Sequence, residues 1–444
     1  MKKDKKKIVL IFMIVAALGI PMTTFGFKIV RGSESPGLKG DSNFNNGNGR
    51  TGEKAENNDS RDRGNKNDKC GRKKNLPTEP TFSENIMYDK YKIADNYVVV
   101  KNRGTRLYSR ADYNSQRTGW ANSGVKIPCE WTQTGWYKVS GEYSGRNYNG
   151  FIAAEHADFH RFRIDDMKAR VRDLYKTDRE GELFAVDNYN SRYGKAPLWN
   201  GKTVDALGNQ RGGSVAMYVS KPEIEVDGDE RVKVVDNTDF MYVSDGTLVK
   251  KLKRGKYFSK VCIVESSREG YIQNMYLDKY GEFDEISLVA VIDTANQNEA
   301  VFKREGNNWE LISKTLCTTG KEGVYSVPTA PGVYGMVQKK PSLFYLKDGT
   351  NELEGYAPYA LRFNGGAYIH GIPVNYIFPM IPDPLDPTKT VKDLSTRIDP
   401  GHREFSRSVG TIPLSHKCVR NYTSHAKFLY DIFEDNKGAV IVIN

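Results

Sequence analysis

The stretch that decides the fold runs from residue 286 to residue 323 and reads ISLVAVIDTANQNEAVFKREGNNWELISKTLCTTGKEG. Short runs rich in Val and Ile are separated by Asn- and Gly-containing turns, the pattern of strands joined by hairpins. The segment VPTAPGVYGMV (327–337) predicts a turn and another strand, and YAPYALRFNGGAYIHGIPV (356–374) predicts a strand pair. The end, GAVIVIN (438–444), reads as a buried strand. We therefore expect a mostly β domain over 285–444.

Two helices are expected beside these strands. In RIDDMKARVRDLYKT (163–177), apolar residues recur at helical offsets, which predicts a packing helix without a chemical role. Those residues are Ile164, Met167, Val171 and Leu174. In HAKFLYDIFED (425–435), one face is again apolar. It carries Ala426, Leu429, Tyr430 and Phe433, with Thr423 or Ser424 as the expected N-cap.

Two smaller β modules are expected ahead of this domain, at 83–160 and 213–281, with a helical or irregular connection over 161–212. Short alternating strands and Gly/Asn turns every 8 to 12 residues or so are the signature of small barrels or sandwiches. The pieces GWYKV (135–139) and GFIAAEHADF (150–159) resemble bacterial Src-homology-3-like wall-binding domains, which implies recognition of peptidoglycan peptides. GYIQNMYLDK, from residue 270, looks like a second such ending and indicates a weak repeat. Two β spacers remain the alternative.

The N-terminal region predicts export. Five Lys stand against one Asp in residues 1–27, and residues 8–27 carry no charge. Twenty such residues are long enough to cross a bilayer, with the lysines on the cytoplasmic side. A cleaved signal peptide, with TFG (24–26) as the cleavage region, is the alternative. Residues 28–82 are poor in apolar side chains and predict a disordered tether of roughly 40 Å reach.

The net charge of +11 does not predict nucleic-acid binding. Residues 1–27 and 28–80 each carry +4, which leaves +3 for the rest of the chain. No basic stripe with interleaved aromatic residues occurs there, so nucleic acid is not an expected partner. No His/Asp/Glu cluster or phosphate-binding Gly loop indicates a metal or nucleotide, so no cofactor is expected either.

The five cysteines indicate one candidate nucleophile. Their spacing fits neither a zinc site nor a dense disulfide framework. Cys129, Cys262 and Cys317 lie in apolar, strand-like runs and are expected in cores, and Cys70 lies in the linker. Cys418 stands instead in PLSHKCVRN (413–421), where a His, a Lys and an Arg crowd around it.

A nucleophilic thiol needs a base, because a free thiol is only a few per cent ionised at neutral pH. The chain offers six histidines: His156, His160, His370, His402, His416 and His425. His416 is two residues from Cys418, so an extended chain can point it elsewhere. His370 ends an apolar strand, where a lone His is usually a satisfied core residue unless a cysteine motif accompanies it. The reaction also needs N–H donors for the oxyanion.

The segments YIHGIPV, SVGTIPLSHKCVRNYTSHAKFLYDIF and GAVIVIN together resemble the catalytic domain of L,D-transpeptidases, cysteine enzymes that cross-link peptidoglycan. The resemblance covers about 285–444 and implies a β-sandwich-like domain. It implies that Cys418 is the nucleophile, His370 the general base, and that the Gly371 carbonyl orients His370. Ser415 and His416 would shape the loop. N–H groups at 417 and 418 would form the oxyanion hole, and Arg420 would buttress the loop or meet a substrate carboxylate.

The sequence departs from that family in three places. Lys417 replaces the Gly that precedes the cysteine, so it either strains the loop or adds a cation that lowers the pKa of the thiol. His370 and Cys418 are 48 residues apart, which is wider than the family pattern, and the extra piece at 374–405 reads as a surface insertion or lid. The segments TTGKEG (318–323) and VPTAPGVYGM (327–336) are similar to an earlier Gly and Thr-Pro-x-Gly segment of the family, but here Ala330 separates Thr329 from Pro331.

The resemblance implies a cell-envelope enzyme that forms 3→3 cross-links between stem peptides, held at the membrane by residues 8–27 or secreted. Water as acceptor would make it an L,D-carboxypeptidase, and an inert Cys418 would leave a peptidoglycan-binding scaffold. A sortase fits less well, because the cysteine of TLCTTG (315–320) stands in the wrong place for the sortase motif. Papain-like amidases place Cys before His, the reverse of the order here.

Overall fold

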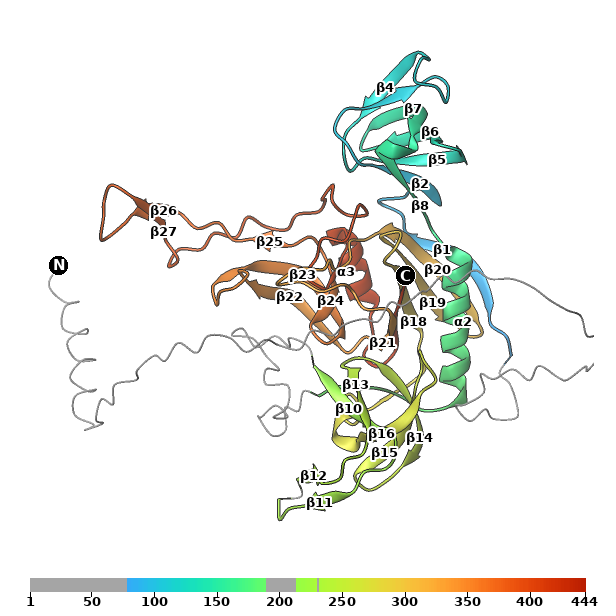
Figure 1. Ribbon diagram of the computed structural model, residues 1–444, viewed down its shortest axis with the longest axis vertical. Helices are drawn as coiled ribbons and strands as arrows, with labels where there is room; N and C mark the ends of the chain where they lie inside the picture. The colour runs from blue at the N-terminus through green and yellow to red at the C-terminus, as the bar shows by residue number, and fades with distance from the viewer. Residues whose placement is uncertain (1–77, 189–212, 230) are drawn as a thin grey trace, which may run out of the picture. The chain divides into compact units, whose positions relative to one another are not determined.

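Two β-sheets packed face to face form the C-terminal part of the chain (Figure 1). The computed structural model describes residues 78–188, 213–229 and 231–444. Most of its regular secondary structure is β-strand, and the described α-helices are α2 (Ile164–Glu180) and α3 (Thr423–Ile432), so the mainly β prediction is confirmed. The first sheet has the order β1-β20-β19-β18-β29-β21. The second has the order β22-β23-β24-β28, with β25 beside β23.

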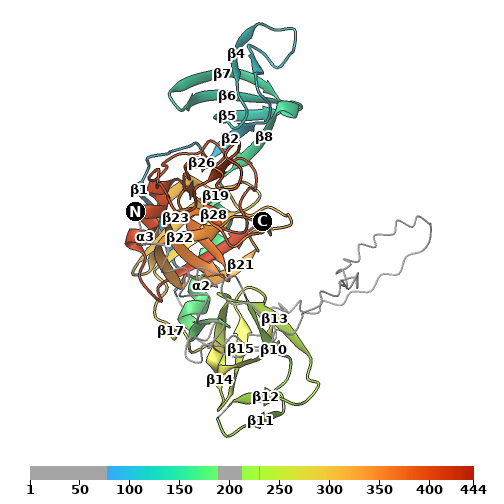
Figure 2. The same ribbon diagram turned by 90° about the vertical axis from the view of Figure 1, so that its left-hand side faces the viewer.

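The strands of the first sheet are β1 (Thr81–Tyr88), β18 (Leu288–Asp293), β19 (Asn298–Glu305), β20 (Asn308–Leu316), β21 (Gly332–Gly335) and β29 (Gly438–Ile443). Those of the second are β22 (Gln338–Leu346), β23 (Leu353–Asn364), β24 (Ala367–His370), β25 (Val374–Asn375) and β28 (Val419–Arg420). Figure 2 shows β22, β23 and β28 together in front of the first sheet. The predicted strands at 286–323 and 438–444 are therefore confirmed as β18, β19, β20 and β29.

The first sheet is a middle layer, covered on both faces. Leu288, Ala290 and Ile292 face the core shared with the second sheet and α3. Val289 and Val291, between them, face a second core that includes α2. Because successive side chains of a strand point to opposite faces, a strand buried on both sides reads as one apolar run.

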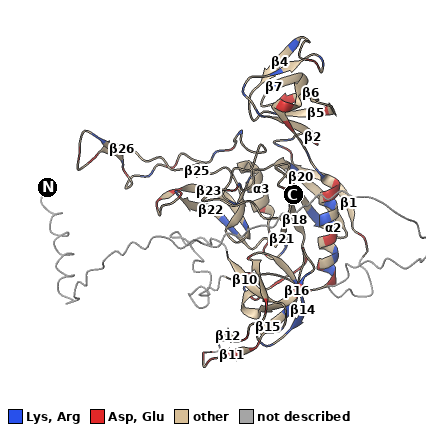
Figure 3. Ribbon diagram, in the orientation of Figure 1, with Lys and Arg blue, Asp and Glu red and all other residues tan. Residues whose placement is uncertain are grey.

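Helix α2 confirms the predicted packing face. Met167, Val171 and Leu174 are buried in the core under the first sheet, and Ile164 packs against its edge. Figure 3 shows basic and acidic residues interspersed along the same helix. Apolar side chains at offsets of three and four therefore dock α2, while its other face stays charged.

Helix α3 confirms the second predicted helix but corrects its N-cap. The N-cap residue is Tyr422, which makes no side-chain capping hydrogen bond, and the Ser424 N–H donates instead to the Glu404 carboxylate at 3.0 Å. The Thr423 hydroxyl donates instead to the Arg403 carbonyl and accepts from the Ile372 N–H at 3.0 Å. The hydroxyl thus joins the start of α3 to the end of the insertion and to the residue after His370 and Gly371.

Strand β1 moves a predicted boundary. Its residues were expected partly in the tether (28–82) and partly in the first module (83–160), but β1 pairs in parallel with β20, with Phe82 opposite Trp309. Phe82 packs against the core under the first sheet. The sequence TFSENIMY has no clear alternation, so nothing local indicated this pairing.

The first module is a sheet of order β4-β3-β7-β6-β5-β2-β8 with its own core. Its strands are β2 (Asn96–Val100), β3 (Thr105–Tyr108), β4 (Arg117–Ala121), β5 (Lys126–Gln133), β6 (Trp136–Tyr143), β7 (Arg146–Ala153) and β8 (Ala157–Arg161), with the 3-10 turn η1 (Ala154–His156) between the last two. Its Src-homology-3-like character remains a prediction.

The second module is a sheet of order β13-β10-β16-β15-β14-β9-β17, also with its own core. Its strands are β9 (Leu183–Ala185), β10 (Ser214–Tyr218), β13 (Phe240–Ser244), β14 (Leu248–Arg254), β15 (Phe258–Ile263), β16 (Glu269–Gln273) and β17 (Glu282–Phe283). A hairpin of β11 (Ile224–Val226) and β12 (Val232–Val234) accompanies it. Here η3 (Asn274–Tyr276) follows β16 as η1 follows β7. Because β9 belongs to this sheet, the module begins within the predicted connection at 161–212.

The insertion at 374–405 lies at the surface and carries the hairpin of β26 (Met380–Pro382) and β27 (Thr390–Lys392). None of the described helices is long and apolar enough to cross a membrane. The expected anchor at 8–27, most of the tether and Cys70 lie outside the described residues.

Candidate active site

The register of β24 and β28 brings Cys418 and His370 to one face of the second sheet. The two strands run parallel, with Ile369 opposite Val419 and His370 opposite Arg420. One residue earlier, Cys418 comes opposite Tyr368. Ile369 and Val419 are fully buried in the core between the sheets, so Cys418 and His370 project from the other face. Ideal strand spacing and rise correspond to a separation of about 8 Å between their Cβ atoms.

His370 is buried, and its tautomer follows from one contact. Its Nδ1 lies 2.6 Å from the Gly371 carbonyl oxygen. A carbonyl can only accept, so Nδ1 carries the proton and Nε2 keeps its lone pair. Burial lowers the pKa of His370 to about 4, and the Arg420 cation acts in the same direction. The imidazole is therefore neutral at physiological pH and can take up a proton.

Cys418 is a half-buried free thiol. Its Sγ lies 3.8 Å from the Gly366 carbonyl oxygen, as a weak S–H donor. Burial raises the pKa of the thiol, while a backbone hydrogen bond from Tyr368 and the cations of Arg420 and Lys417 oppose that rise. The resting thiol is therefore protonated, and its activation requires a base.

The loop before Cys418 is fixed by backbone contacts. Ser415 N donates to the Thr319 carbonyl at 3.0 Å, and the Ser415 hydroxyl donates to the Cys418 carbonyl. The His416 carbonyl accepts from Val327 N at 2.7 Å. Ser415 is buried, so this loop is held by its polar groups rather than by apolar packing.

Thr329 is a further loop residue, to which the sequence assigned no role. Its hydroxyl donates to the Lys417 carbonyl and accepts from the Gly320 N–H, both at 2.8 Å. A Cβ on Gly320 would lie 2.9 Å from the Lys417 Cα and 2.4 Å from the Val327 oxygen. The segment at Gly320 and the loop at Lys417 therefore meet backbone to backbone, and only glycine fits at position 320.

Lys417 does not strain the loop. The described non-glycine residues with positive φ are Ser144, Ser267, Gln297, Tyr359 and Asn436, and Lys417 is not among them. Its Nζ donates to Asn364 Oδ1 at 3.2 Å. Of the two alternatives drawn from the sequence, the structure therefore favours an added cation near the thiol over a strained backbone.

The N–H groups of Lys417 and Cys418 have no hydrogen-bond acceptor among the described residues. Two such donors beside the sulfur are what an oxyanion hole needs. His416, by contrast, points into solvent and pairs with Asp348 at 3.0 Å. Its side chain therefore takes no part in this arrangement.

Arg420 shares the face of Cys418 and His370. Its backbone exchanges hydrogen bonds with Thr318, both at 2.9 Å. Its Nε is buried without a hydrogen-bond acceptor in the described part of the chain. An arginine with a spare donor beside a nucleophile can bind a carboxylate.

A buried polar network, which the sequence did not indicate, lies behind this face. Asn421 N donates to the His370 carbonyl at 2.8 Å, and Asn421 Nδ2 donates to Glu299 Oε2 and to His425 Nδ1, both at 2.8 Å. His425 Nε2 then donates to Ser313 Oγ at 2.7 Å. His425 is fully buried, so it serves this network rather than Cys418.

No protein-family model and no curated protein matches this chain. Among solved structures, a fused Zn-dependent amidase/peptidase/peptidoglycan-binding protein from Clostridium acetobutylicum is 18% identical, over 36% of this chain and 54% of that one (TM-score 0.22). An L,D-transpeptidase from Mycobacterium smegmatis is 14% identical, over 50% and 77% of the two chains (TM-score 0.25). L,D-transpeptidase 3 from Mycobacterium tuberculosis is 10% identical, over 78% and 96% (TM-score 0.25).

The chain thus spans about half the length of the Clostridium protein. All three TM-scores lie below 0.5. The functional conclusion therefore rests on this chain's own residues.

Proposed function

We propose that this chain is a cell-envelope L,D-transpeptidase that forms 3→3 cross-links in peptidoglycan through a Cys418 acyl-enzyme. The observation that carries the proposal is the parallel pairing of β24 and β28, which sets Cys418 and His370 on one face, together with the Gly371 contact that leaves His370 Nε2 as a base. The resemblance of the surrounding motifs to that family supplies the substrate class.

In the first half-reaction, His370 Nε2 takes the thiol proton as the sulfur attacks the carbonyl that joins the third stem residue to the terminal D-amino acid. The N–H groups of Lys417 and Cys418 would stabilise the oxyanion. The terminal D-amino acid leaves with the proton from His370. In the second half-reaction, an amine of a neighbouring stem peptide attacks the thioester, His370 accepts its proton, and the thiol is restored.

Arg420 is proposed to meet a carboxylate of the stem peptide, since its guanidinium shares the face of the nucleophile. Residues 8–27 are proposed to hold the enzyme at the membrane or to direct its export, and the two modules to bind or space the wall. Water as acceptor would make the same site an L,D-carboxypeptidase.

Other assignments have weaker support. Cys317, the cysteine of the sortase-like segment, is fully buried, and burial raises the pKa of its thiol well above the ordinary value. It therefore cannot meet a sorting-signal peptide. A wall-binding scaffold with an inert Cys418 remains the second candidate, because a protonated, half-buried thiol is also what an inert cysteine shows.

The deciding experiment is intact mass after incubation with a carbapenem. Residues 28–444 would be compared with Cys418→Ala and with Cys317→Ser as the matched cysteine control. One adduct that is lost only in Cys418→Ala supports the enzyme. No adduct on folded wild-type protein would leave the scaffold. With a wild-type adduct in hand, isolated stem peptides then separate cross-linking from hydrolysis by product mass.

A further inference from the structure

The turn between β23 and β24, residues 364–366, carries the nucleophile loop on one side. Cys418 Sγ lies against the Gly366 carbonyl oxygen at 3.8 Å. Lys417 Nζ donates to Asn364 Oδ1 at 3.2 Å. Both side chains at the tip of the proposed catalytic loop therefore rest on this turn, and its position helps to set theirs.

The second module holds the same turn from the other side. Gly365 N donates to the Asp245 carbonyl at 3.1 Å, where Asp245 follows β13. Gly365 O accepts from Arg362 Nε at 2.5 Å. Both terminal nitrogens of Arg362 lie 3.0 Å from Oδ2 of Asp187, which follows β9. The turn is thus fastened to the module directly and through an ion pair.

This ion pair is fully buried: neither Arg362 nor Asp187 has exposed side-chain surface. Further partners complete it, since Tyr280 OH lies 2.8 Å from Arg362 Nη1 and Lys279 Nζ 3.3 Å from Asp187 Oδ1. The cost of taking two charges out of water makes such a pair poor evidence for stability. Its directional contacts do fix one arrangement of the two parts that it joins, the second module and the 364–366 turn.

The backbone approach at this junction is equally close. Gly246, at φ +87°, would carry a Cβ only 1.8 Å from the Phe363 carbonyl oxygen. Its own carbonyl accepts from Gly335 N at 2.9 Å. A larger residue at 246 must therefore push the module and the turn apart.

The charges of the junction also reach the loop. Asp245 raises and Arg362 lowers the pKa of the Lys417 ammonium, within an overall decrease caused by burial. The loop therefore responds to the junction both through contact and through the local field.

We propose that the buried Asp187–Arg362 pair is a positioning element by which the second module sets the 364–366 turn and, through it, the Cys418 thiol. This inference rests on the proposed function for its catalytic meaning, but the placement of the thiol is testable without it. The second module is then a structural part of the active site rather than a spacer.

The test measures how fast iodoacetamide alkylates Cys418 across pH, read by mass on the Cys418 peptide, in residues 28–444. Asp187→Asn removes the carboxylate charge with little change of shape, and Gly246→Ala inserts a wedge without changing charge. Both should let water reach the thiol and lower the midpoint of its alkylation profile by at least half a pH unit. The carbapenem acylation rate, which needs an aligned oxyanion site, should fall about tenfold or more.

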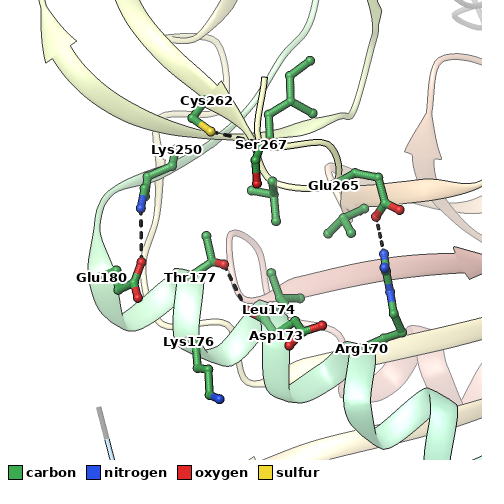
Figure 4. A pocket seen from close by; sticks show the side chains of 13 residues that line it. Arg170, Asp173, Leu174, Lys176, Thr177, Glu180, Lys250, Cys262, Glu265 and Ser267 are labelled. Carbon is green, nitrogen blue, oxygen red and sulfur yellow. Dashed lines mark hydrogen bonds and ion pairs between the residues drawn. The ribbon is translucent and has the colours of Figure 1, made fainter. Parts of the chain in front are cut away.

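Two matched controls separate positioning from general damage. Glu180→Gln breaks another ion pair at the second module, in which Lys250 of β14 lies 3.2 Å from Glu180 of α2 in the lining of a pocket (Figure 4). Gly281→Ala adds a methyl group at a similar φ of +74° with nothing within 4 Å. Both should keep the wild-type midpoint and acylation rate. Tyr280→Phe, which removes one hydrogen bond from Arg362, should give a smaller shift in the same direction and serves if the stronger variants do not fold.

The proposal would be overturned if folded Asp187→Asn and Gly246→Ala kept the wild-type alkylation midpoint. If only Tyr280→Phe folds, a wild-type midpoint in that variant would overturn it. Equal shifts in the two controls would also overturn it, because the effect would then be general loosening. Absence of carbapenem acylation in the wild-type protein would count against the proposed function, while the alkylation midpoints would still decide the positioning role.

Discussion

Changing the pH probes His370 without changing any atom of the fold. Burial lowers the pKa of His370 from 6.5 to about 4, so protonating it in the folded protein costs about 3 kcal/mol more than in water. The neutral fraction at pH 5 is then about 0.9. For an ordinary histidine it would be about 0.03. Between pH 7 and pH 5 the rate constant for acylation should therefore fall by only about 1.1-fold, compared with about 25-fold for an unshifted base.

The assay is the second-order rate constant for carbapenem acylation of Cys418, measured from pH 4 to pH 9 by stopped-flow or quenched mass analysis. His370→Asn is the control and should show a much lower rate without this acid limb. The same pKa shift affects stability: a histidine with a lowered folded pKa contributes stability above about pH 6.5 that is lost as the pH falls toward 4. Near-UV circular dichroism must therefore show a folded protein at each pH. An acid limb centred near pH 6.5 on folded protein would refute the assignment of a buried, neutral His370 as the base.

Three further predictions concern the surroundings of the site. Arg420→Gln removes the cation that disfavours both the imidazolium and the protonated thiol, so the acid limb of the acylation profile should move to higher pH. An unchanged acid limb would contradict the placement of Arg420 on the face of His370 and Cys418. Lys417→Gly should lower the free energy of unfolding by about 1 kcal/mol in urea titrations, because no positive φ is relieved; a gain in stability would contradict this. Glu299 is buried and its pKa is raised from 4.5 to about 7, so its contribution to stability below pH 4.5 is lost as the pH rises to 7. Glu299→Gln should therefore gain about 3 kcal/mol relative to wild type between pH 4.5 and 7.5, and a constant difference would show that Glu299 is not protonated in the fold.

Local patterns predicted those elements whose own side chains decide their structure. The sequence predicted the apolar face of α2 and the doubly buried strands β18 and β29, because apolar residues recur there with the period of a helix or as a continuous run. The pairing of Cys418 with His370 came from a family resemblance rather than from spacing, since 48 residues separate them.

What the sequence missed depends on partners far along the chain. The Asp187–Arg362 pair joins residues 175 positions apart, and neither residue has neighbours that mark it among the 55 acidic and 66 basic residues. The predicted N-cap of α3 was wrong because the Thr423 hydroxyl forms hydrogen bonds with Arg403 and Ile372. These tertiary contacts outweigh the capping preference of the residue type. The sequence could not decide whether Lys417 strains its loop, because residue type only suggests the φ angle. The backbone shows that Lys417 has no positive φ.

The parallel pairing of β1 with β20 has a mechanical consequence. A pull along the axis of β1, applied ahead of residue 81, loads the paired stretch Thr81–Glu84 in shear rather than opening its pairs one by one. The first module follows β1 in the chain and lies outside this load path while the pairing holds. An enzyme attached through its N-terminal segment to one layer and working on another could thus bear tension without deforming the module that lies nearest in sequence to its point of attachment.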